Sequence, residues 1–297
     1  MLRRKREFLL SYSLIVPVLL VLLLIILVPS LWAFRLSFFK YRLGQAEPMT
    51  YVGLKNYLTV VKDSYFVLAF ARTVIFMVAS VSLQLVSGFL LALLIAKPFP
   101  LKGLWISLIL SPMAVSPAVL AVIWKYLLDF NIGPINYLFQ ITGLPRLMWL
   151  TDKRLAMMTV ILVYSWGSLP GVFLLLYPVR LSIPNELYEV AEIDGASAIQ
   201  SMFHVTLPLM TPAILVALVF RTIISFRSFG VFQTLTQGGP NRATEVLSLY
   251  LFNQAFRYWK YGAGAAVAFF MLLVTIIVAS GQIRKMHESL FAKQILK

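Results

Sequence analysis

The stretch PNELYEVAEIDGASAIQSMFHVTLPL, residues 184–209, separates two long apolar runs and contains four of the eleven acidic residues of the chain. Its pattern predicts two short helices. Ser182 and Pro184 form a start signal, and Gly195 suits the left-handed residue that ends a helix. The first helix then carries an apolar stripe made of Leu187, Val190, Ala191 and Ile193. This stretch is therefore a structured loop and not a plain connector.

The second helix of this loop opens at Ser197, where Gln200 three residues on completes a capping box. Leu207 and Pro208 close the loop and start the next apolar run. A helix with an apolar stripe and an acidic flank suits a groove on a soluble partner. The alternative is a helix that rests on lipid. Such helices are usually basic on their polar face, however, and anionic headgroups repel acidic ones.

The composition excludes a water-soluble globule. The 297 residues are 60% hydrophobic and 12% charged, with a mean hydropathy of +0.87, whereas soluble domains are roughly 45–50% apolar and 25% charged. The excess apolar surface must face lipid. The formal net charge is +15, but most of the basic residues are scattered between apolar runs and form no sustained stripe that could follow phosphates, which argues against nucleic acid as a partner.

Six membrane spans are expected. Charge-free runs cover residues 8–34, 73–96, 103–124, 155–179 and 261–283, and each has the roughly 20 residues that a helix needs to cross the hydrocarbon. A sixth run, 205–220, is long enough if its helix continues through Arg221 and Arg227 to about Val231. The fold class is therefore an all-α membrane protein with six transmembrane helices.

No residue pattern predicts catalysis or a bound cofactor. Cysteine is absent, and the two histidines, His204 and His287, belong to no metal-binding cluster. The chain also lacks a Walker phosphate loop and the nucleophile elbow of a serine hydrolase. We expect no cofactor in this chain and no enzymatic activity.

Basic residues orient the spans only weakly. With the N-terminus inside, eleven Lys and Arg lie in the inner segments and eleven in the outer ones. The inner segments are shorter, and four consecutive basic residues precede the first span: Arg3, Arg4, Lys5 and Arg6. This density favours an N-terminus inside the cell.

Arg221 is the most costly residue of the predicted spans. It lies about 21 Å along a helix counted from Leu207, and none of the eleven acidic residues falls within a span. Its partners are therefore expected to be water, backbone carbonyls, a second subunit or the substrate. Arg221, Ser225 and Ser228 fall on one helix face, which either lines a cavity or joins this helix to a neighbour.

The run 155–179 contains residues that disturb a regular helix. Gly167, Pro170 and Gly171 are expected to interrupt it, and Tyr164 and Trp166 add aromatic surface. Discontinuous helices at the middle of a membrane expose backbone groups that bind ligands. The alternative is a proline kink with a close-packing face at Gly167 and Gly171.

Two motifs carry a resemblance to a known family. The residues Glu189, Val190, Ala191, Gly195, Val205, Leu207 and Pro208 resemble the EAA loop of binding-protein-dependent ABC importer permeases. Residues 193–197, IDGAS, and 206–209, TLPL, are similar to the carbohydrate, maltose-type branch. The segment LTQGGP, residues 235–240, resembles the LTxGGP segment of the same branch, and the resemblance covers about residues 65–285.

The resemblance implies a type I importer permease fold, a coupling role for the loop and a set of partners. The loop would dock into a cytoplasmic ATPase through Leu187, Glu189, Val190, Ala191, Asp194, Gly195, Leu207 and Pro208. Val190 stands where the family usually has alanine but remains apolar. The implied partners are a second permease subunit, two ATPases that bind ATP and Mg²⁺, an extracytoplasmic solute-binding protein, a carbohydrate and the lipid bilayer. Both termini would be cytoplasmic, in a bacterial or archaeal cytoplasmic membrane.

The resemblance also implies a substrate site in the fourth and fifth spans. By distance from Glu189, its residues are Gly167, Ser168, Gly171, Val172, Arg221, Ser225, Ser228 and Phe229. A sugar is the expected substrate, and a glycerol-phosphate or polyol is the alternative, since Arg221 and Arg227 could favour phosphate. A secondary transporter or channel is the alternative of another class, although it would commonly carry intramembrane carboxylates. The expected regions are 1–67, a core 68–284 with the loop 180–208, and a tail 285–297.

Overall fold

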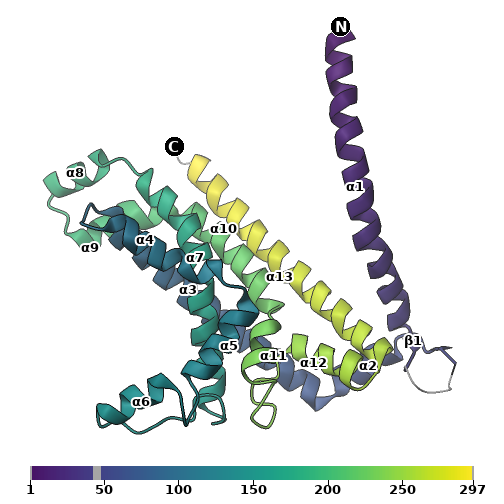
Figure 1. Cartoon of the computed structure of the whole chain (residues 1–297). Helices are drawn as coiled ribbons and strands as arrows, with labels where there is room; N and C mark the ends of the chain where they lie inside the picture. Colours follow the sequence, from purple (N-terminus) through teal and green to yellow (C-terminus); the bar gives the residue numbers. More distant parts are fainter. Residues whose placement is uncertain (1, 43–47, 296–297) are drawn as a thin grey trace. The chain divides into compact units, whose positions relative to one another are not determined.

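The computed structural model describes residues 2–42 and 48–295, with side chains described within 15–42 and 48–288 (Figure 1). The side chains of Arg3, Arg4, Lys5 and Arg6 and the end of the 285–297 tail lie outside this part. The chain divides into two compact units, one made of residues 1–66 and 251–270 and the other of residues 67–250 and 271–297. Helices α3 (Ser64–Ala96) and α13 (Tyr261–Ile295) run through both units.

The smaller unit begins with α1 (Leu2–Ser37), an apolar helix whose most hydrophobic window is 0% buried. Strands β1 (Phe39–Lys40) and β2 (Thr50–Tyr51) follow and pair antiparallel, with Phe39 opposite Tyr51. Helix α2 (Lys55–Lys62) comes next. Its Asn56 donates to the carbonyls of Ser37 and Phe39 at 2.8 and 2.9 Å. The Asn56 side chain of α2 therefore joins α2 to the end of α1 and the start of β1.

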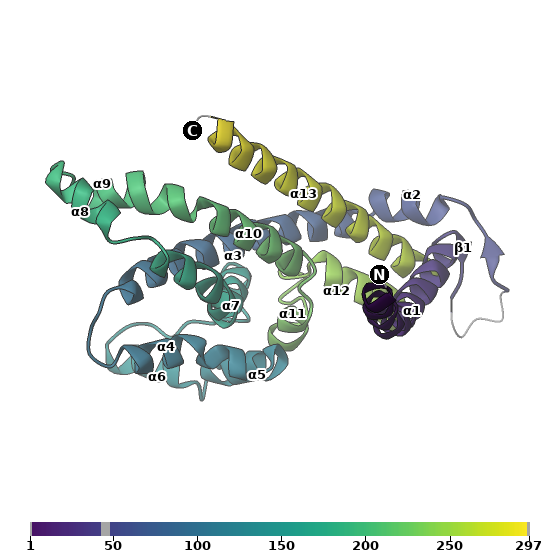
Figure 2. The same ribbon diagram turned by 90° about the horizontal axis from the view of Figure 1, so that it is seen from above.

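The larger unit is a helical bundle that continues from α3. Its further elements, with the segment that leads back to α13, are α4 (Lys102–Leu110), the 3₁₀ turn Ser111–Ala114, α5 (Pro117–Leu127), α6 (Pro134–Ile141), α7 (Leu155–Leu181), α8 (Glu186–Ile193), α9 (Ala198–Ser201), the π-helical turn Met202–Thr206, α10 (Leu207–Phe226), α11 (Gly230–Leu235), α12 (Leu247–Phe252) and the π-helical turn Asn253–Arg257. Helices α7 and α10 lie side by side in both ribbon views (Figures 1 and 2).

Five helices in the described part are long and apolar enough to cross a membrane: Ile15–Ser37, Ser64–Ala96, Leu155–Leu181, Ala198–Phe226 and Tyr261–Glu288. They confirm five of the six predicted spans as helices of that kind. The predicted span 103–124 is not one continuous helix, because Lys102–Ala114 and Pro117–Leu127 meet at 102°. Ser116 adopts an extended conformation there and caps α5 by accepting from the Val119 N–H. Six spans result when this bent pair is counted as one.

The span predicted from the run 205–220, which is the fifth in chain order, has different ends from those expected. It was expected to start at Leu207 and Pro208 and to reach Val231, but the helix already starts at Ala198 and continues through the π-helical turn. Pro208 is accommodated where the wider π-helical turn Met202–Thr206 passes into α10. The helix ends at Phe226, and after it Val231 and Phe232 of α11 are buried in an apolar cluster. Burial of α11 thus turns the chain away from the axis of α10.

Helix α7 is continuous from Leu155 to Leu181, so the predicted interruption at Gly167, Pro170 and Gly171 is wrong. A proline removes one backbone hydrogen bond of a helix, and the neighbouring turns remain helical. At Gly167 a Cβ atom would lie 2.9 Å from Leu120 Cδ1 of α5. Gly167 therefore serves close helix packing, which was the alternative interpretation.

Apolar side chains of the described residues form clusters within the larger unit. One gathers Phe76, Leu120, Val160, Phe232 and Leu249 from α3, α5, α7, α11 and α12. Another gathers Ala92, Val172, Leu176, Ile183 and Met210 near the junction of α7 with α8. Helix α7 contributes to both clusters, and it joins the α6 end of the unit to the α8 end (Figure 1).

Candidate functional site

Helix α8 ends at Gly195 in the way that the sequence predicts. Asp194 is the C-cap, and Gly195 has φ +77°, in the left-handed region. The Gly195 N–H donates to the Glu192 carbonyl at 3.0 Å, and the Ala196 N–H donates to the Ala191 carbonyl at 2.8 Å. These bonds satisfy carbonyls that the end of a helix leaves free. The chain reverses sharply here and enters α9.

The capping box at the start of α9 is also confirmed. Ser197 Oγ accepts from the Gln200 N–H at 3.4 Å, and the Ser197 N–H donates to Gln200 Oε1 at 2.7 Å. The predicted start signal of α8 is wrong, because Asn185 occupies the N-cap and makes no side-chain cap bond. Ser182 instead donates to the Val179 carbonyl at 2.8 Å and completes the end of α7.

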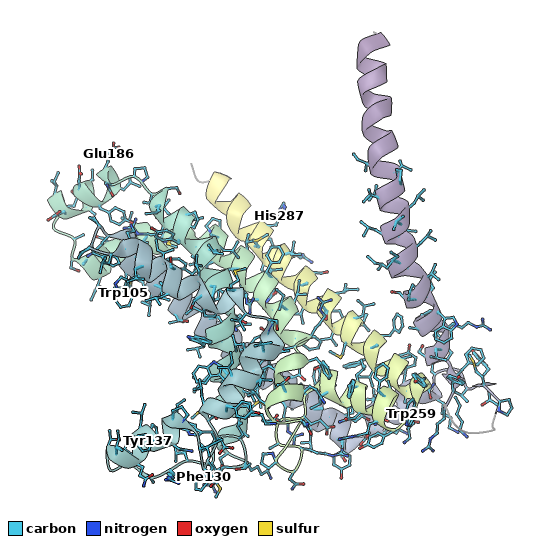
Figure 3. The ribbon with its side chains drawn as sticks, in the orientation of Figure 1. Trp105, Phe130, Tyr137, Glu186, Trp259 and His287 are labelled. Atoms are coloured by element: carbon cyan, nitrogen blue, oxygen red, sulfur yellow. The ribbon has the colours of Figure 1, made fainter. Side chains whose placement is uncertain are left out.

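The apolar stripe of α8 is exposed. Leu187 is 42%, Val190 56% and Ile193 85% exposed, and Glu186 and Glu189 are exposed beside them. In Figure 3, Glu186 marks this end of the larger unit, whereas Phe130 and Tyr137 mark the other end. An apolar stripe with acidic neighbours is the surface that a groove on another protein would cover. We call Glu186–Ile193 with Asp194 and Gly195 the coupling helix.

The opposite side of the coupling helix is fastened to the bundle. The Tyr188 hydroxyl lies 2.8 Å from Thr206 Oγ1, in the turn before α10. The Arg180 guanidinium, at the end of α7, lies 4.7 Å above the Tyr188 ring, a distance typical of a cation–π contact. Sequence reasoning missed Tyr188 and Arg180. Tyr188 therefore connects α8 to the end of α7, through Arg180, and to the start of α10, through Thr206.

Arg221 on α10 has a neutral partner inside the same chain. Its Nε donates to Gln84 Oε1 of α3 at 2.6 Å. The prediction that its acceptors would be water, backbone carbonyls, a second subunit or the substrate is therefore wrong for this nitrogen. The signal was present in the sequence, since Gln84 is a large polar residue within the apolar run 73–96. The two residues are 137 positions apart, and no local pattern pairs them.

Residues of helix α7 also lie beside the Arg221 guanidinium. The central carbon of the guanidinium lies 6.0 Å from the centre of the Tyr164 ring, and a Cβ atom on Gly171 would lie 3.9 Å from Arg221 Nη1. Ser225 is 1% exposed, and its hydroxyl lies 3.3 Å from the Tyr164 hydroxyl. Gln84, Tyr164, Gly171, Arg221 and Ser225 therefore form one group, which we call the Arg221 cluster.

Other predicted substrate residues make contacts of other kinds. Ser228 follows the end of α10, so it does not continue the helical stripe, and its carbonyl accepts from Ser248 Oγ at 2.5 Å. Phe229 packs against the apolar cluster around Phe232. Val172 is 0% exposed, and its Cγ1 would lie 2.6 Å from a Cβ atom on Gly88. Ser168 is half-buried on α7.

The LTQGGP segment forms a tightly bonded loop after α11. Thr244 Oγ1 donates to the Gly239 carbonyl at 2.8 Å and lies 2.7 Å from Thr236 Oγ1. A cleft of about 400 Å³ lies between this loop and residues that include Lys125, Asp129 and Trp149. Backbone N–H groups of Ile132 and Asn131 hold the pKa of Asp129 below its usual range. Within the described residues, no group of three or more His, Asp or Glu side chains is arranged to hold a metal ion.

The chain is similar to a known protein family and to permease proteins of transport systems. Residues 84–283 match the family described as binding-protein-dependent transport system inner membrane component. The chain is 34% identical over 275 residues to the trehalose/maltose transport system permease protein MalF of Thermococcus litoralis, covering 93% of this chain and 92% of the relative. It is 30% identical over 237 residues to the sn-glycerol-3-phosphate transport system permease protein UgpA of Agrobacterium fabrum, covering 79% and 80%.

A solved structure has a similar fold. A chain of a bacterial ABC transporter involved in the import of the acidic polysaccharide alginate superposes with a TM-score of 0.82 at 22% identity, covering 96% of each chain. The similarity extends over nearly the whole chain.

Proposed function

Because this chain belongs to the family of binding-protein-dependent transport system inner membrane components, we propose that it is the permease subunit of an ATP-driven sugar importer. The family, the type I importer fold and the membrane helices agree with the sequence-based prediction. The chain supplies the substrate pathway, and separate subunits bind ATP and Mg²⁺ and hydrolyse the nucleotide.

The exposed coupling helix is the observation that carries this function. Leu187, Val190 and Ile193 present apolar surface, while Tyr188 fastens the helix to the bundle. Displacement of the helix by a partner is passed to α7 and α10, because α8 follows α7 directly and Tyr188 contacts the turn before α10. The proposed docking and coupling residues are Leu187, Glu189, Val190, Ala191, Asp194, Gly195, Leu207 and Pro208.

This role sets the orientation and the partners. The coupling helix faces one of two cytoplasmic ATPase subunits, so both chain termini lie in the cytoplasm of a bacterial or archaeal cell. The α6 end and the LTQGGP loop face a solute-binding protein outside. One coupling helix per chain requires a second permease subunit, and we propose a related but separate one.

The substrate is proposed to be an oligosaccharide or a related polyol. The relative named for trehalose and maltose supports a sugar. The proposed contacts in the Arg221 cluster are Gly171, Arg221 and Ser225. The other residues that the sequence resemblance implies as substrate contacts are Gly167, Ser168, Val172, Ser228 and Phe229. A glycerol-phosphate is the second candidate, because Gln84 does not neutralise Arg221 and one relative is named for that substrate.

A secondary transporter or channel fits the structure less well. Such proteins commonly use intramembrane carboxylates for ion coupling, and the sequences of α3, α7 and α10 contain neither Asp nor Glu. Dependence of uptake on ATP distinguishes the two classes directly.

The test reconstitutes the chain with its ATPase and permease partners in liposomes and adds the binding protein and radiolabelled maltose, trehalose or sn-glycerol 3-phosphate. We expect ATP-dependent uptake of at least one sugar. Glu189→Lys should abolish uptake and sugar-stimulated ATP hydrolysis. Glu288→Lys, which changes an exposed acid on α13 outside the coupling helix, is the control. Uptake without ATP, or full coupling in Glu189→Lys, would contradict the proposal.

A further inference from the structure

Gln84 is a buried polar residue without an assigned role. It lies in the middle of α3, is 0% exposed, and accepts the Arg221 Nε–H at 2.6 Å. A bond to a charged donor in a buried setting is stronger than one between neutral groups. Gln84 therefore fixes the direction of the Arg221 side chain across the α3–α10 boundary.

The guanidinium is held on further sides by α7. The Tyr164 ring lies 6.0 Å from its carbon, and Gly171 leaves room for Nη1, which would lie 3.9 Å from a Cβ atom there. A larger side chain at 171 would fill the space beside Nη1. The cluster thus restrains Arg221 through an amide, a ring face and a glycine, none of which carries charge.

Two donors of this pair remain without an acceptor. Gln84 Nε2 and Arg221 Nη2 are both buried and have no hydrogen-bond partner among the described residues. Nε and Nη2 share one edge of the planar guanidinium, so the free Nη2 donor points in the same general direction as the Nε bond to Gln84. A buried donor without a partner costs about 1–3 kcal/mol. Two such donors on adjoining groups are suited to an oxygen acceptor.

The choice of an amide at position 84 preserves the charge of Arg221. A glutamate there would accept the same Nε–H but would form an ion pair with the guanidinium and neutralise it. Glutamine accepts the bond, keeps the positive charge available and adds a donor through Nε2. It therefore gives the pair an excess of donors.

We propose that Gln84 is a specificity-determining residue of the substrate pathway, where its Nε2 and Arg221 Nη2 donate together to an oxygen acceptor of the transported sugar. The inference rests on the proposed sugar import. Hydroxyl, ring and glycosidic oxygens are the acceptors that a sugar offers. Both donors are closed off in this structure, so the sugar reaches them when α3, α7 and α10 separate during the transport cycle.

Gln84→Glu in the complete reconstituted transporter tests this role. It keeps the acceptor for Nε, so the packing remains, but it removes the Nε2 donor and neutralises Arg221. With radiolabelled maltose and trehalose as probes, we expect maximal uptake to fall about tenfold or more, as for the loss of a charge-assisted hydrogen bond, and the ratio of the two rates to change. The variant should co-purify with its ATPase and permease partners in wild-type amounts, which separates loss of the sugar contact from a failure to fold.

Gln282→Glu is the matched control. Gln282 on α13 also contacts α10: its Nε2 donates to Oγ1 of Thr222, the residue after Arg221, at 3.1 Å. It is therefore a glutamine that bonds to the same helix without contacting the guanidinium. Wild-type uptake rates and an unchanged maltose-to-trehalose ratio in Gln84→Glu would overturn the proposed role of Gln84. An equal loss of uptake in Gln282→Glu would overturn it too. Neither result would contradict sugar import itself. A wild-type transporter that takes up no sugar would overturn the proposed function, and this inference with it.

Discussion

The Tyr188 hydroxyl lies 2.8 Å from Thr206 Oγ1, and this contact joins the coupling helix to the start of α10. Fifteen residues further along the same helix, Arg221 donates to Gln84. A surface proposed to bind an ATPase and a cluster proposed to bind substrate thus share one rigid element.

Tyr188→Phe should weaken this connection without unfolding the bundle. The ring remains for the contact with Arg180, but the hydrogen bond to Thr206 is lost, which removes about 1 kcal/mol. We expect fewer sugars transported per ATP and faster amide exchange at residues 186–195. Tyr177→Phe is the control, since Tyr177 uses its ring to stack on Phe173. An unchanged ratio of transport to ATP hydrolysis in Tyr188→Phe would show that this contact does not carry coupling.

Gly195→Ala should affect coupling more than stability. Gly195 has φ +77° and open space around it, so alanine introduces only backbone strain, about 1–2 kcal/mol. Gly143 also has φ +77° and open space, and it follows the C-cap of α6 as Gly195 follows that of α8. The two variants should lower the melting temperature equally, but only Gly195→Ala should reduce sugar-stimulated ATP hydrolysis. Equal hydrolysis in both would refute a special role for Gly195.

Most local features of this chain could be predicted, whereas long-range ones could not. The left-handed Gly195 and the Ser197–Gln200 capping box depend on residues close in sequence, and both were found correctly. The bend between α4 and α5 was missed although its signal, the Ser116–Pro117 start of α5, is local. The partner of Arg221, in contrast, lies 137 residues away. Hydropathy detects that a helix is apolar but does not determine which polar side chain on another helix faces it.

The same limit applies to the predicted substrate residues. Distance from Glu189 selected a continuous face of α7, but the neighbours of that face differ from residue to residue. Gly167 packs on Leu120, Gly171 lies beside Arg221, and Val172 packs on Gly88. The division into regions 1–67, 68–284 and 285–297, and the substrate roles themselves, stay predictions.

Gly88→Ala should destabilise the larger unit. The new Cβ atom would lie 2.6 Å from Val172 Cγ1 and 3.1 Å from its Cβ, where both helices are closely packed. Overpacking of this kind costs about 1–3 kcal/mol, so the melting temperature in detergent should fall.

Val172→Ala in the Gly88→Ala background provides the check. Removing the two methyl groups relieves the clash, so the double variant should be more stable than the sum of the single effects predicts. Additive losses would show that α3 and α7 do not meet at this pair.

Asn136→Leu should disorder the loop between α6 and α7. Asn136 is 1% exposed, donates to the carbonyls of Asp129 and Leu147 at 3.2 and 3.0 Å, and accepts from the Leu147 N–H and Trp149 Nε1 at 3.0 and 3.2 Å. Leucine has a similar volume but replaces none of these four bonds, so about 3 kcal/mol of stability should be lost because buried polar groups are left unpaired.

Amide exchange at Leu147 should accelerate in Asn136→Leu. Stimulation of ATP hydrolysis by the binding protein should fall, since the α6 end is proposed to receive the binding protein. Asn131→Leu alters an exposed asparagine of the preceding loop, between α5 and α6, and serves as the control. Equal exchange at Leu147 in the two variants would contradict the organising role of Asn136.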